Sequence, residues 1–219
     1  MTLSIAYSRV SLPSAESLDE ALFDLDVMAT IHNSSTEPVD INWGRARANA
    51  KLNPDIANST NKNVMRHLFR AHDVPMPQLY TIHEARSRVM DGHAIIGRPD
   101  YHSRGRGFWR CDNAFDMNRA LKGTRTKQAA THFMEEIKAD HEYRVHIFQG
   151  KSIRISEKKF TTESYPGRPH YRPYTTIKPT GDVRHVRAAA KAAVAAVGLD
   201  FGAVDILATD TACWVLEVN

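Results

Sequence analysis

The sequence predicts an α+β protein, and three features of the chain support this fold class. Short segments with strand character alternate with amphipathic helical segments along the 219 residues. The clearest helix covers residues 183–197, where valine and alanine recur at helical spacing and Gly198 follows as a stop signal. The last two expected strands, 202–207 and 214–219, are strongly apolar and are joined by a short polar link. This length accommodates one large domain or two small domains around a cleft.

In the first half of the chain, helices and short strands are expected in alternation. Apolar residues recur every three or four positions through the first helix, and Ser59 is the expected N-cap of the second. Val64, Leu68 and Ala71 lie on one apolar stripe of that second helix, with Met65 and Phe69 beside it. In order, the expected elements are a strand over 3–7, a helix over 17–31, a strand over 39–43, a helix over 59–72, an extended segment over 78–82, a helix over 83–90, a strand over 94–98, a loop over 100–107, a strand over 108–111 and a helix over 114–122.

The second half of the chain is expected to contain most of the strands. Gln149 and Gly150 have the composition of a two-residue hairpin turn. Residues 161–180 contain four prolines and no clear period, which predicts a long loop. In order, the expected elements are strands over 131–134, 142–148 and 151–160, the loop, the helix over 183–197 and the two final strands.

The composition indicates a soluble globular protein. Hydrophobic residues make up 42 % of the chain and charged residues 25 %, as in ordinary globular domains. No apolar run approaches the roughly 18 residues that a membrane span needs, and the first ten residues lack a signal-peptide pattern. Cys111 and Cys213 are far apart, which argues against a zinc site and favours a reducing cytoplasm. The net charge of +4 and basic clusters around 98–110 and 144–172 point weakly to an anionic partner.

Three oxygen-bearing side chains lie on the final two strands. Glu217 and Asn219 are two residues apart, so they point to the same face of a strand. A neighbouring strand can bring Asp205 beside them. Polar side chains in an apolar strand are costly unless they are partnered. Carboxylate and amide oxygens suit Mg²⁺, which normally shares its coordination with phosphates. The alternative is a solvated surface strand.

A basic loop with glycines follows the strand over 94–98. Arg98 ends this strand, and Arg104, Gly105 and Gly107 lie in the loop. Glycine lets backbone N–H groups approach phosphate oxygens closely, and arginine is a forked phosphate donor. A phosphate-binding loop is therefore one interpretation. A basic surface hairpin or an RNA-binding loop is the other.

The following segment combines groups that suit a nucleotide. Residues 133–137 are first apolar and then acidic, which suits a slot for a flat purine, and Glu142 can lie near a ribose or an acceptor. The alternative for this segment is a solvated acidic turn. In the next strand Lys158 and Lys159 face opposite sides, so one can enter a cleft while the other stays in solvent.

The order of these motifs resembles that of the ATP-grasp superfamily, and most of all its carboxylate–amine ligases of the glutamate-adding, ribosomal-protein-modifying type. The resemblance runs from about Asn58 to Asn219. Its most specific pieces are GLDFGAVDIL over 198–207 and LEVN over 216–219, and residues 61–77 resemble the helix-then-strand entry of that fold. The chain looks most like phage-encoded relatives with shortened leading domains.

The resemblance implies an ATP-grasp fold in which Mg-ATP, or Mn-ATP, lies between two α+β subdomains. Residues 1–57 would be a short leading segment, 58–128 the subdomain with the glycine-rich loop, and 129–219 the subdomain with the metal ligands. The implied reaction joins a carboxylate to an amine through an acyl phosphate and releases ADP. The sequence identifies neither substrate, but basic residues in 161–180 favour an acidic one such as an amino acid or a peptide.

The resemblance also implies roles for individual residues. Asp205, Glu217 and Asn219 match the Mg²⁺ ligands of the family. Arg144 matches an active-site arginine near the acyl phosphate, and Lys158 is the second expected catalytic residue. The expected nucleotide-binding residues are Arg98, Arg104, Gly105, Gly107, Phe133, Met134, Glu135, Glu136, Ile137, Glu142 and Lys159.

The chain departs from the family pattern in three respects. Arg98 stands where the family usually has a lysine, and the segment before Asn58 is short for a leading domain. The family normally continues beyond the Glu-x-Asn motif with a loop and a helix. A partner chain or a homo-oligomer that completes the C-terminal edge of the site is one expectation from this difference. A nucleotide-binding module without ligase activity is the main alternative function, and a nucleic-acid-binding protein is the weaker one.

Overall fold

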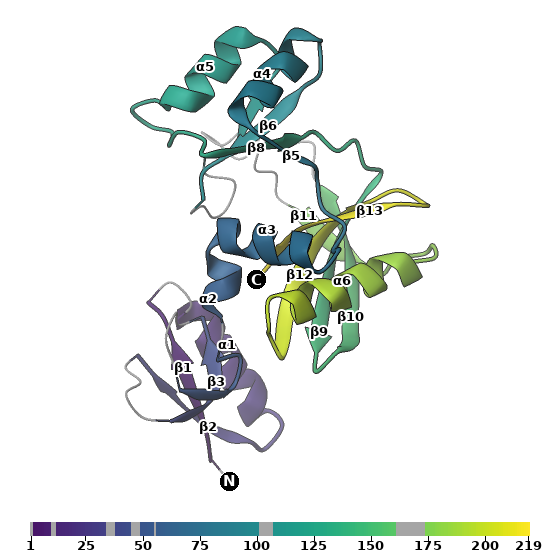
Figure 1. The fold of residues 1–219 in the computed structure, drawn as a ribbon. Helices are drawn as coiled ribbons and strands as arrows, with labels where there is room; N and C mark the ends of the chain where they lie inside the picture. The colour runs from purple at the N-terminus through teal and green to yellow at the C-terminus, as the bar shows by residue number, and fades with distance from the viewer. Residues whose placement is uncertain are drawn as a thin grey trace.

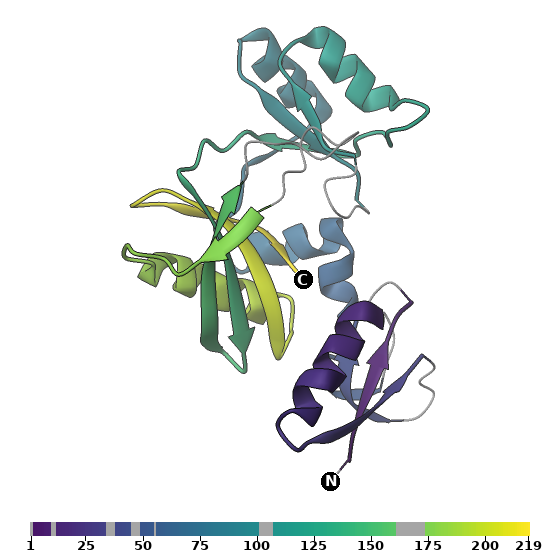
Figure 2. The same cartoon turned by 180° about the vertical axis from the view of Figure 1, so that it is seen from behind.

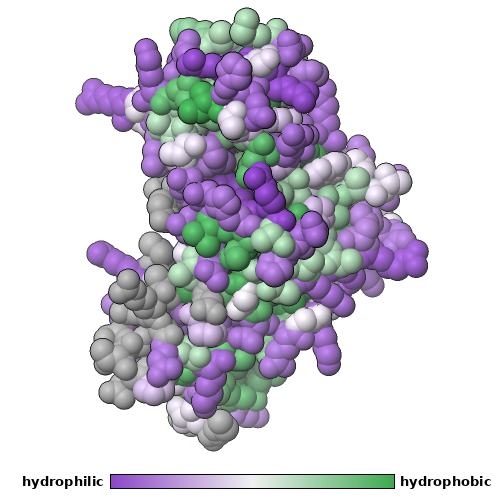
Figure 3. Space-filling view, viewed as in Figure 1, coloured by the Kyte–Doolittle hydropathy of each residue, from purple (hydrophilic) through white to green (hydrophobic). Residues whose placement is uncertain are grey.

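The structure, a computed structural model, describes residues 2–9, 12–33, 38–44, 49–54, 56–100, 107–160 and 174–219. These residues form three β-sheets, each accompanied by helices, and Figure 1 shows them as three units that are separate in space. The same arrangement seen from behind in Figure 2 places the N-terminal unit at one end and the second sheet at the other. On the face seen in Figure 3, apolar residues lie in separate patches among hydrophilic ones. No helix in the described part of the chain is long and apolar enough to span a membrane.

The N-terminal unit is a parallel sheet with the strand order β2-β1-β3-β4. The helix predicted over 17–31 is wrong in its second half, because Asp26 adopts a left-handed conformation (φ 57°) and the chain then forms a strand beside β1. The strand over 50–52 was not predicted from the sequence. The elements are β1 (Thr2–Tyr7), α1 (Leu12–Phe23), β2 (Met28–His32), β3 (Val39–Trp43) and β4 (Ala50–Leu52).

The second unit is an antiparallel sheet with the strand order β5-β8-β6-β7, covered on one side by two helices. Thr81 caps the first of these helices with a capping box that includes Glu84. Phe133, Trp109 and Met117 lie in the core between the sheet and the helices. The elements are β5 (Leu79–Tyr80), α4 (Ile82–Met90), β6 (Ile95–Arg98), β7 (Trp109–Cys111), α5 (Ala114–Lys122) and β8 (His132–Glu135).

The third unit is an antiparallel sheet with the strand order β11-β10-β9-β12-β13. The predicted turn at Gln149 and Gly150 is confirmed, since both have positive φ (44° and 71°) and join β9 to β10. Of the loop predicted over 161–180, residues 161–173 lie outside the described part, whereas 174–177 form a strand. The elements are β9 (His141–Phe148), β10 (Lys151–Phe160), β11 (Tyr174–Ile177), α6 (Arg184–Ala196), β12 (Phe201–Ala208) and β13 (Cys213–Val218).

Helix α6 covers one face of this third sheet with the alanine- and valine-rich stripe that its sequence predicts. Val186, Ala190, Ala193 and Val194 are buried against Val145 and the other apolar residues of the sheet. The helix ends at Gly198, which has a φ of 72° and therefore supplies the left-handed residue of a helix stop. The opposite face of the sheet remains free for polar side chains.

Two further helices, α2 (Ala57–Thr60) and α3 (Lys62–Ala71), connect the N-terminal unit to the others. Asn61 caps α3, not the expected Ser59. Of the apolar side chains that the sequence places on this helix, Met65 and Phe69 are fully buried and pack into the core of the third sheet, whereas Val64 is exposed. Strand β8 pairs with β6, so the second sheet extends beyond the expected boundary at residue 128. The three units therefore interleave along the chain.

Asn53 ties the N-terminal unit to the third sheet. It is buried and left-handed (φ 56°), a conformation that asparagine tolerates well. Its Oδ1 accepts from the backbone N–H groups of Asp200 at 2.8 Å and Phe201 at 3.1 Å, and its Nδ2 donates to the Phe201 carbonyl at 2.9 Å. Trp43 stacks on the Phe201 ring with centroids 5.4 Å apart. One side chain thus fixes the start of β12.

We expect Asn53→Ala to lower the free energy of unfolding by about 2–4 kcal/mol, because it leaves buried backbone groups of β12 without partners. Asn58→Ala is the control: that side chain makes one hydrogen bond, from Nδ2 to the Val197 carbonyl at 3.1 Å, and its loss should cost about 1 kcal/mol. Urea denaturation followed by circular dichroism measures both. Equal destabilisation by the two variants would contradict the role of Asn53.

Candidate active site

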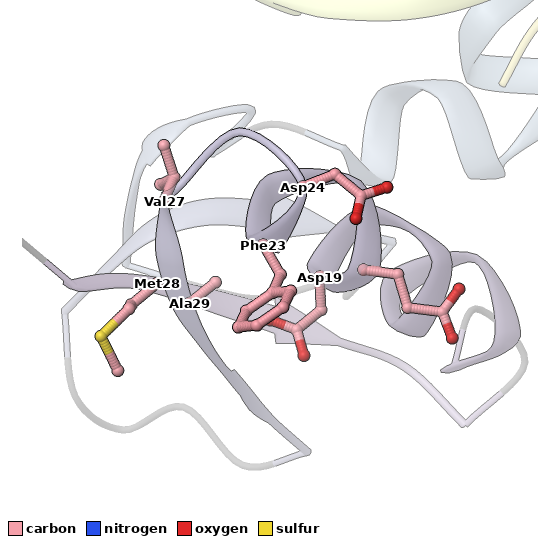
Figure 4. A pocket seen from close by; sticks show the side chains of 7 residues that line it. Asp19, Phe23, Asp24, Val27, Met28 and Ala29 are labelled. Atoms are coloured by element: carbon pink, nitrogen blue, oxygen red, sulfur yellow. The ribbon is translucent and has the colours of Figure 1, made fainter.

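Two hollows of suitable size differ sharply in their electrostatics. The hollow of about 510 Å³ between α1 and β2 is lined by Asp19, Glu20, Phe23 and Asp24, and Figure 4 shows the Asp19 carboxylate beside the ring of Phe23. None of its described lining residues is a cation, so these carboxylates repel phosphates. The second hollow, of about 390 Å³, lies between the second and third sheets and is lined by both acidic and basic side chains. Of these two hollows, only the second suits a phosphorylated ligand, and we call it the central cleft.

One part of the central cleft is apolar and takes its lining from both sheets. Ile96 and Met134 come from β6 and β8 of the second sheet, while Leu207 and Leu216 come from β12 and β13 of the third. Ile137, in the segment that joins the two sheets, completes this part. Apolar walls on two sides suit a flat aromatic ring, with the connecting segment at its edge.

The carboxylate of Asp205 is at the centre of the polar part of the cleft. It is 5 % exposed, on strand β12. Arg144 of β9 grips both of its oxygens, with Nε 2.9 Å from Oδ1 and Nη2 2.7 Å from Oδ2. Lys158 of β10 lies 2.9 Å from Asp205 Oδ1 and 2.6 Å from Glu142 Oε1. The four side chains form one network across three neighbouring strands, which compensates the cost of burying the charges.

This network shifts the proton affinities of its members. Hydrogen bonding to Asp205 raises the pKa of Arg144 far above its usual range. Burial opposes the charge on Lys158, but Asp205 and Glu142 outweigh it and raise the pKa of that ammonium. Burial raises the pKa of Glu142, which Lys158 only partly counters. Lys158 therefore stays a cation at neutral pH and acts as an electrostatic group.

Glu217 and Asn219 lie beside Asp205, as the sequence predicts. Asp205 and Glu217 are directly opposite each other in the β12–β13 ladder, which places them on one face. Asn219 Nδ2 lies 3.2 Å from Glu217 Oε1 and 3.4 Å from Asp205 Oδ2. The register shifts after this pair, and this bulge lets the consecutive residues Leu216 and Glu217 both line the cleft.

Lys62 and Arg66 belong to the site although no sequence motif singled them out. Both are buried at the start of α3, where Lys62 Nζ lies 3.1 Å from Glu217 Oε2. Arg66 lines the central cleft. In the sequence, two cations four residues apart in a helix read as a solvated face. The cap residue Asn61 marks where the helix begins, but it does not reveal which face of the helix is buried.

Arg98 reaches the cleft from the second sheet, opposite Arg66. Burial lowers the pKa of Arg98. Burial, and then the nearby charge of Arg98, lower the pKa of Arg66 to about 10. His132, the cross-strand neighbour of Arg98, has its pKa lowered to about 4 by burial and then by Arg66. At neutral pH the region therefore presents two guanidinium cations and a neutral imidazole, which suits an anion.

Other expected residues also line the cleft, but protein groups already hold the carboxylates of Glu135 and Glu136. Met134, Ile137 and Glu142 line the cleft. Glu135 and Glu136 also line it, but Gln78 N–H donates to the Glu135 carboxylate at 2.8 Å and Arg110 holds the Glu136 carboxylate through Nε and Nη2.

The structure does not bring Phe133 and Lys159 to the cleft. Strand alternation turns Phe133 into the core under α4 and α5. Lys159 pairs with Glu157 on the face of β10 opposite Lys158. Arg104 and Gly105 lie outside the described residues. Gly107 has a φ of 70°, and a Cβ there would lie 2.6 Å from Pro99 Cγ, so glycine is required at that position.

The donor set at Asp205, Glu217 and Asn219 fits a hard cation that shares its ligands. Two carboxylates and one amide are too few to enclose a metal ion, and the described residues contain no group of three His, Cys, Asp or Glu side chains that could hold one. Mg²⁺ is commonly held by one or two carboxylates together with substrate phosphates. The residues therefore fit Mg²⁺ that is bound jointly with a phosphorylated ligand.

Comparison with known proteins relates the chain to solved structures but not to sequence families. No protein-family model and no curated protein sequence matches the chain. The D-alanine–D-alanine ligase from Bacillus anthracis is 15 % identical, with 100 % of this chain and 86 % of that chain covered and a TM-score of 0.74. The ATP-grasp ligase PsnB, complexed with a minimal precursor, Mg and ADP, is 16 % identical, with 99 % and 87 % covered and a TM-score of 0.66.

A third similar structure is that of an enzyme named for a different compound, D-cycloserine. The D-cycloserine synthetase DcsG is 17 % identical, with 100 % of this chain and 91 % of that chain covered and a TM-score of 0.63. At such low identities the likeness concerns the fold alone, and it extends over all three units. The predicted α+β fold is confirmed. The chain therefore has the fold of the ATP-grasp ligases.

Proposed function

We propose that this chain is an ATP-dependent carboxylate–amine ligase that binds Mg-ATP in the central cleft. The observation that carries the proposal is the convergence, in one cleft, of cations suited to phosphates with the carboxylates of Asp205 and Glu217. Two similar structures support it, because a PsnB complex contains Mg and ADP and a D-alanine–D-alanine ligase complex contains ATP. The acid and the amine are expected to be small molecules or peptides.

In the proposed orientation, the base of the nucleotide would lie in the apolar part of the cleft and its phosphates in the polar part. The base would lie between Met134 and Leu207, with its edge toward the backbone of residues 135–137. The side chains of Glu135 and Glu136 are already held by protein groups, so the backbone is what this segment offers to the base. The phosphates would then lie toward Arg66 and Arg98. Glu142 also lines the cleft, and its carboxylate would accept hydrogen bonds from the ribose hydroxyls.

The residues of the polar part suit attack by a carboxylate on the terminal phosphate. Mg²⁺, held by Asp205, Glu217 and Asn219, would supply neutralisation of phosphate charge. Arg98 and Arg66 would hold the phosphate oxygens in line for transfer. Arg144 and Lys158 lie beside Asp205, where they would stabilise the acyl phosphate. Attack on the terminal phosphate forms the acyl phosphate and releases ADP. The amine then attacks the acyl carbon and loses a proton, phosphate leaves, and an amide bond forms.

Arg98→Ala should weaken Mg-ATP binding about tenfold to hundredfold, because a charged hydrogen bond contributes about 1.5–3 kcal/mol. Arg98→Lys should keep most of the affinity and lose part of the turnover, because an ammonium lacks the bidentate geometry of guanidinium. Arg184→Ala is the matched control, since Arg184 is exposed on α6 and, among the described residues, pairs only with Asp182. Calorimetry measures affinity, and coupled ADP release measures turnover with acid and amine panels.

The outcomes of this experiment separate the alternatives. Wild-type protein that binds Mg-ATP but releases no ADP with any acid and amine would favour a nucleotide-binding module without ligase activity. Failure to bind Mg-ATP at millimolar concentration would contradict both and favour a nucleic-acid-binding protein. An unchanged affinity of Arg98→Ala would remove Arg98 from the site.

Glu217→Gln should reduce the gain in ATP affinity that Mg²⁺ provides, about tenfold or more, because it removes a charged ligand oxygen. In EDTA the same variant should bind ATP at least as well as wild type, since one negative charge near the phosphates is gone. Glu16→Gln on the exposed side of α1 is the control. Titration with ATP in Mg²⁺ and in EDTA gives the ratio, and an unchanged ratio would contradict the metal assignment.

A further inference from the structure

Among the described residues, no strand pairs with the outer edge of β10 over half of its length. Strand β11 pairs with β10 only from Glu157 to Phe160, whereas β9 pairs with it from Lys151 to Glu157. Over residues 151–156 no described strand lies on the outer side of β10. An open strand edge offers backbone N–H and C=O groups to an extended chain. This edge therefore has the geometry for adding a strand that continues the line of β11.

A hollow of about 360 Å³ runs along this open edge, and we call it the edge groove. Its cations come from three elements: Arg154 from β10, Lys178 from just after β11, and Arg187 from α6. None of its described lining residues is acidic. The remaining lining is apolar or carries hydroxyls, and comprises Ile153, Ile155, Ser156, Thr176 and Ile177. Its electrostatics select an anionic occupant.

The cations lie on both faces of the sheet edge. Arg154 pairs in register with His146, on the face that carries Arg144 and the central cleft. Arg187 belongs to α6 on the opposite face of the sheet, and its Nη1 is 2.6 Å from Ser152 Oγ. Side chains of an extended peptide alternate between the two faces of a sheet. A peptide strand paired with β10 would therefore meet a cation on each face in turn.

Two apolar side chains at the edge groove are unusually exposed. Ile153 is 66 % exposed and Ile177 is 42 % exposed. Ile153 occupies the register shift between Ser152 and Arg154, which turns it out of the regular ladder. Exposed isoleucines beside cations suit the aliphatic parts of an acidic peptide better than a small free anion.

We propose that the edge groove docks an acidic, extended peptide segment by strand addition to β10. Naming this peptide as the substrate of the ligase rests on the proposed function, whereas the docking itself does not. The groove is close to the central cleft, because Arg154 is two residues, or about 7 Å, from Ser156, and Ser156 is the cross-strand partner of Arg144. A peptide held there would present a neighbouring carboxylate to the cleft.

Fluorescence anisotropy with a fluorescein-labelled hexaglutamate peptide tests the docking on the full chain. Wild type should bind it with an affinity that falls as salt rises, and a hexalysine peptide should not bind. Arg154→Glu and Lys178→Glu should each weaken binding tenfold or more. Arg184→Glu, the same charge change outside the groove, should stay within twofold. Equal losses in Arg184→Glu and the groove variants would overturn the proposal, because they would show a net-charge effect.

Backbone pairing is tested with two N-methylated hexaglutamate peptides, one methylated at alternate residues and one at every residue. Only alternate amides of an added strand face its neighbour, so the first peptide keeps one edge that can pair and should bind, whereas the second should not. Equal binding of the two peptides would exclude strand addition. Tighter binding of a single-stranded oligonucleotide, lost in Arg154→Glu, would assign the groove to nucleic acid and overturn the peptide proposal.

Mg-ATP affinity of the same variants separates the two proposals. Arg154→Glu and Lys178→Glu should bind Mg-ATP as wild type does, because neither residue lines the central cleft. Peptide binding without Mg-ATP binding would contradict the ligase and leave the docking intact. Mg-ATP binding without peptide binding would contradict the docking alone.

Discussion

The ion pair between Asp205 and Arg144 is the interaction on which the site depends. A carboxylate on a central strand is expensive to bury, and it is retained only if neighbouring strands deliver cations to it. The bidentate geometry requires β9 and β12 to pair in one register, since a shift by one residue would turn Arg144 to the α6 face. Lys158 adds the same requirement for β10. The charges of the site and the register of the sheet therefore specify each other.

Those parts of the fold that follow from local patterns could be predicted from the sequence. The stripe of α6, the turn at Gln149 and Gly150, and the shared face of Glu217 and Asn219 all depend on residues close together in the chain. The helix expected over 17–31 failed for a non-local reason. Its second half has helical apolar spacing, but Met28–His32 pairs with β1, and this long-range contact outweighs the local preference.

The site residues that could not be predicted also depend on contacts between segments that are far apart in the sequence. The sequence shows that Lys158 and Lys159 face opposite sides, yet only the pairing of β10 with β9 decides which one meets Glu142. Phe133 and Met134 likewise face opposite sides of β8, and only the packing of the sheet decides that Phe133 enters the core and Met134 lines the cleft. Lys62 and Arg66 enter the site because α3 packs on the third sheet through Met65 and Phe69. The sequence shows the helical spacing of Met65 and Phe69, but Val64 and Leu68 have the same spacing beside them, and only the packing decides between the two rows.

The positions of Arg66 and Arg98 have a consequence for how the fold behaves as an assembly of units. Arg66 is carried by α3 on the third sheet, and Arg98 by the second sheet, so the two units approach each other with like charges facing. Asp100 and Glu217 offset part of this repulsion around Arg66. A triphosphate between the guanidinium groups would turn repulsion into attraction. The nucleotide of the proposed ligase would then be a counter-ion between the two units as well as a reactant, and a nucleoside without phosphates would leave the repulsion between the guanidinium groups in place.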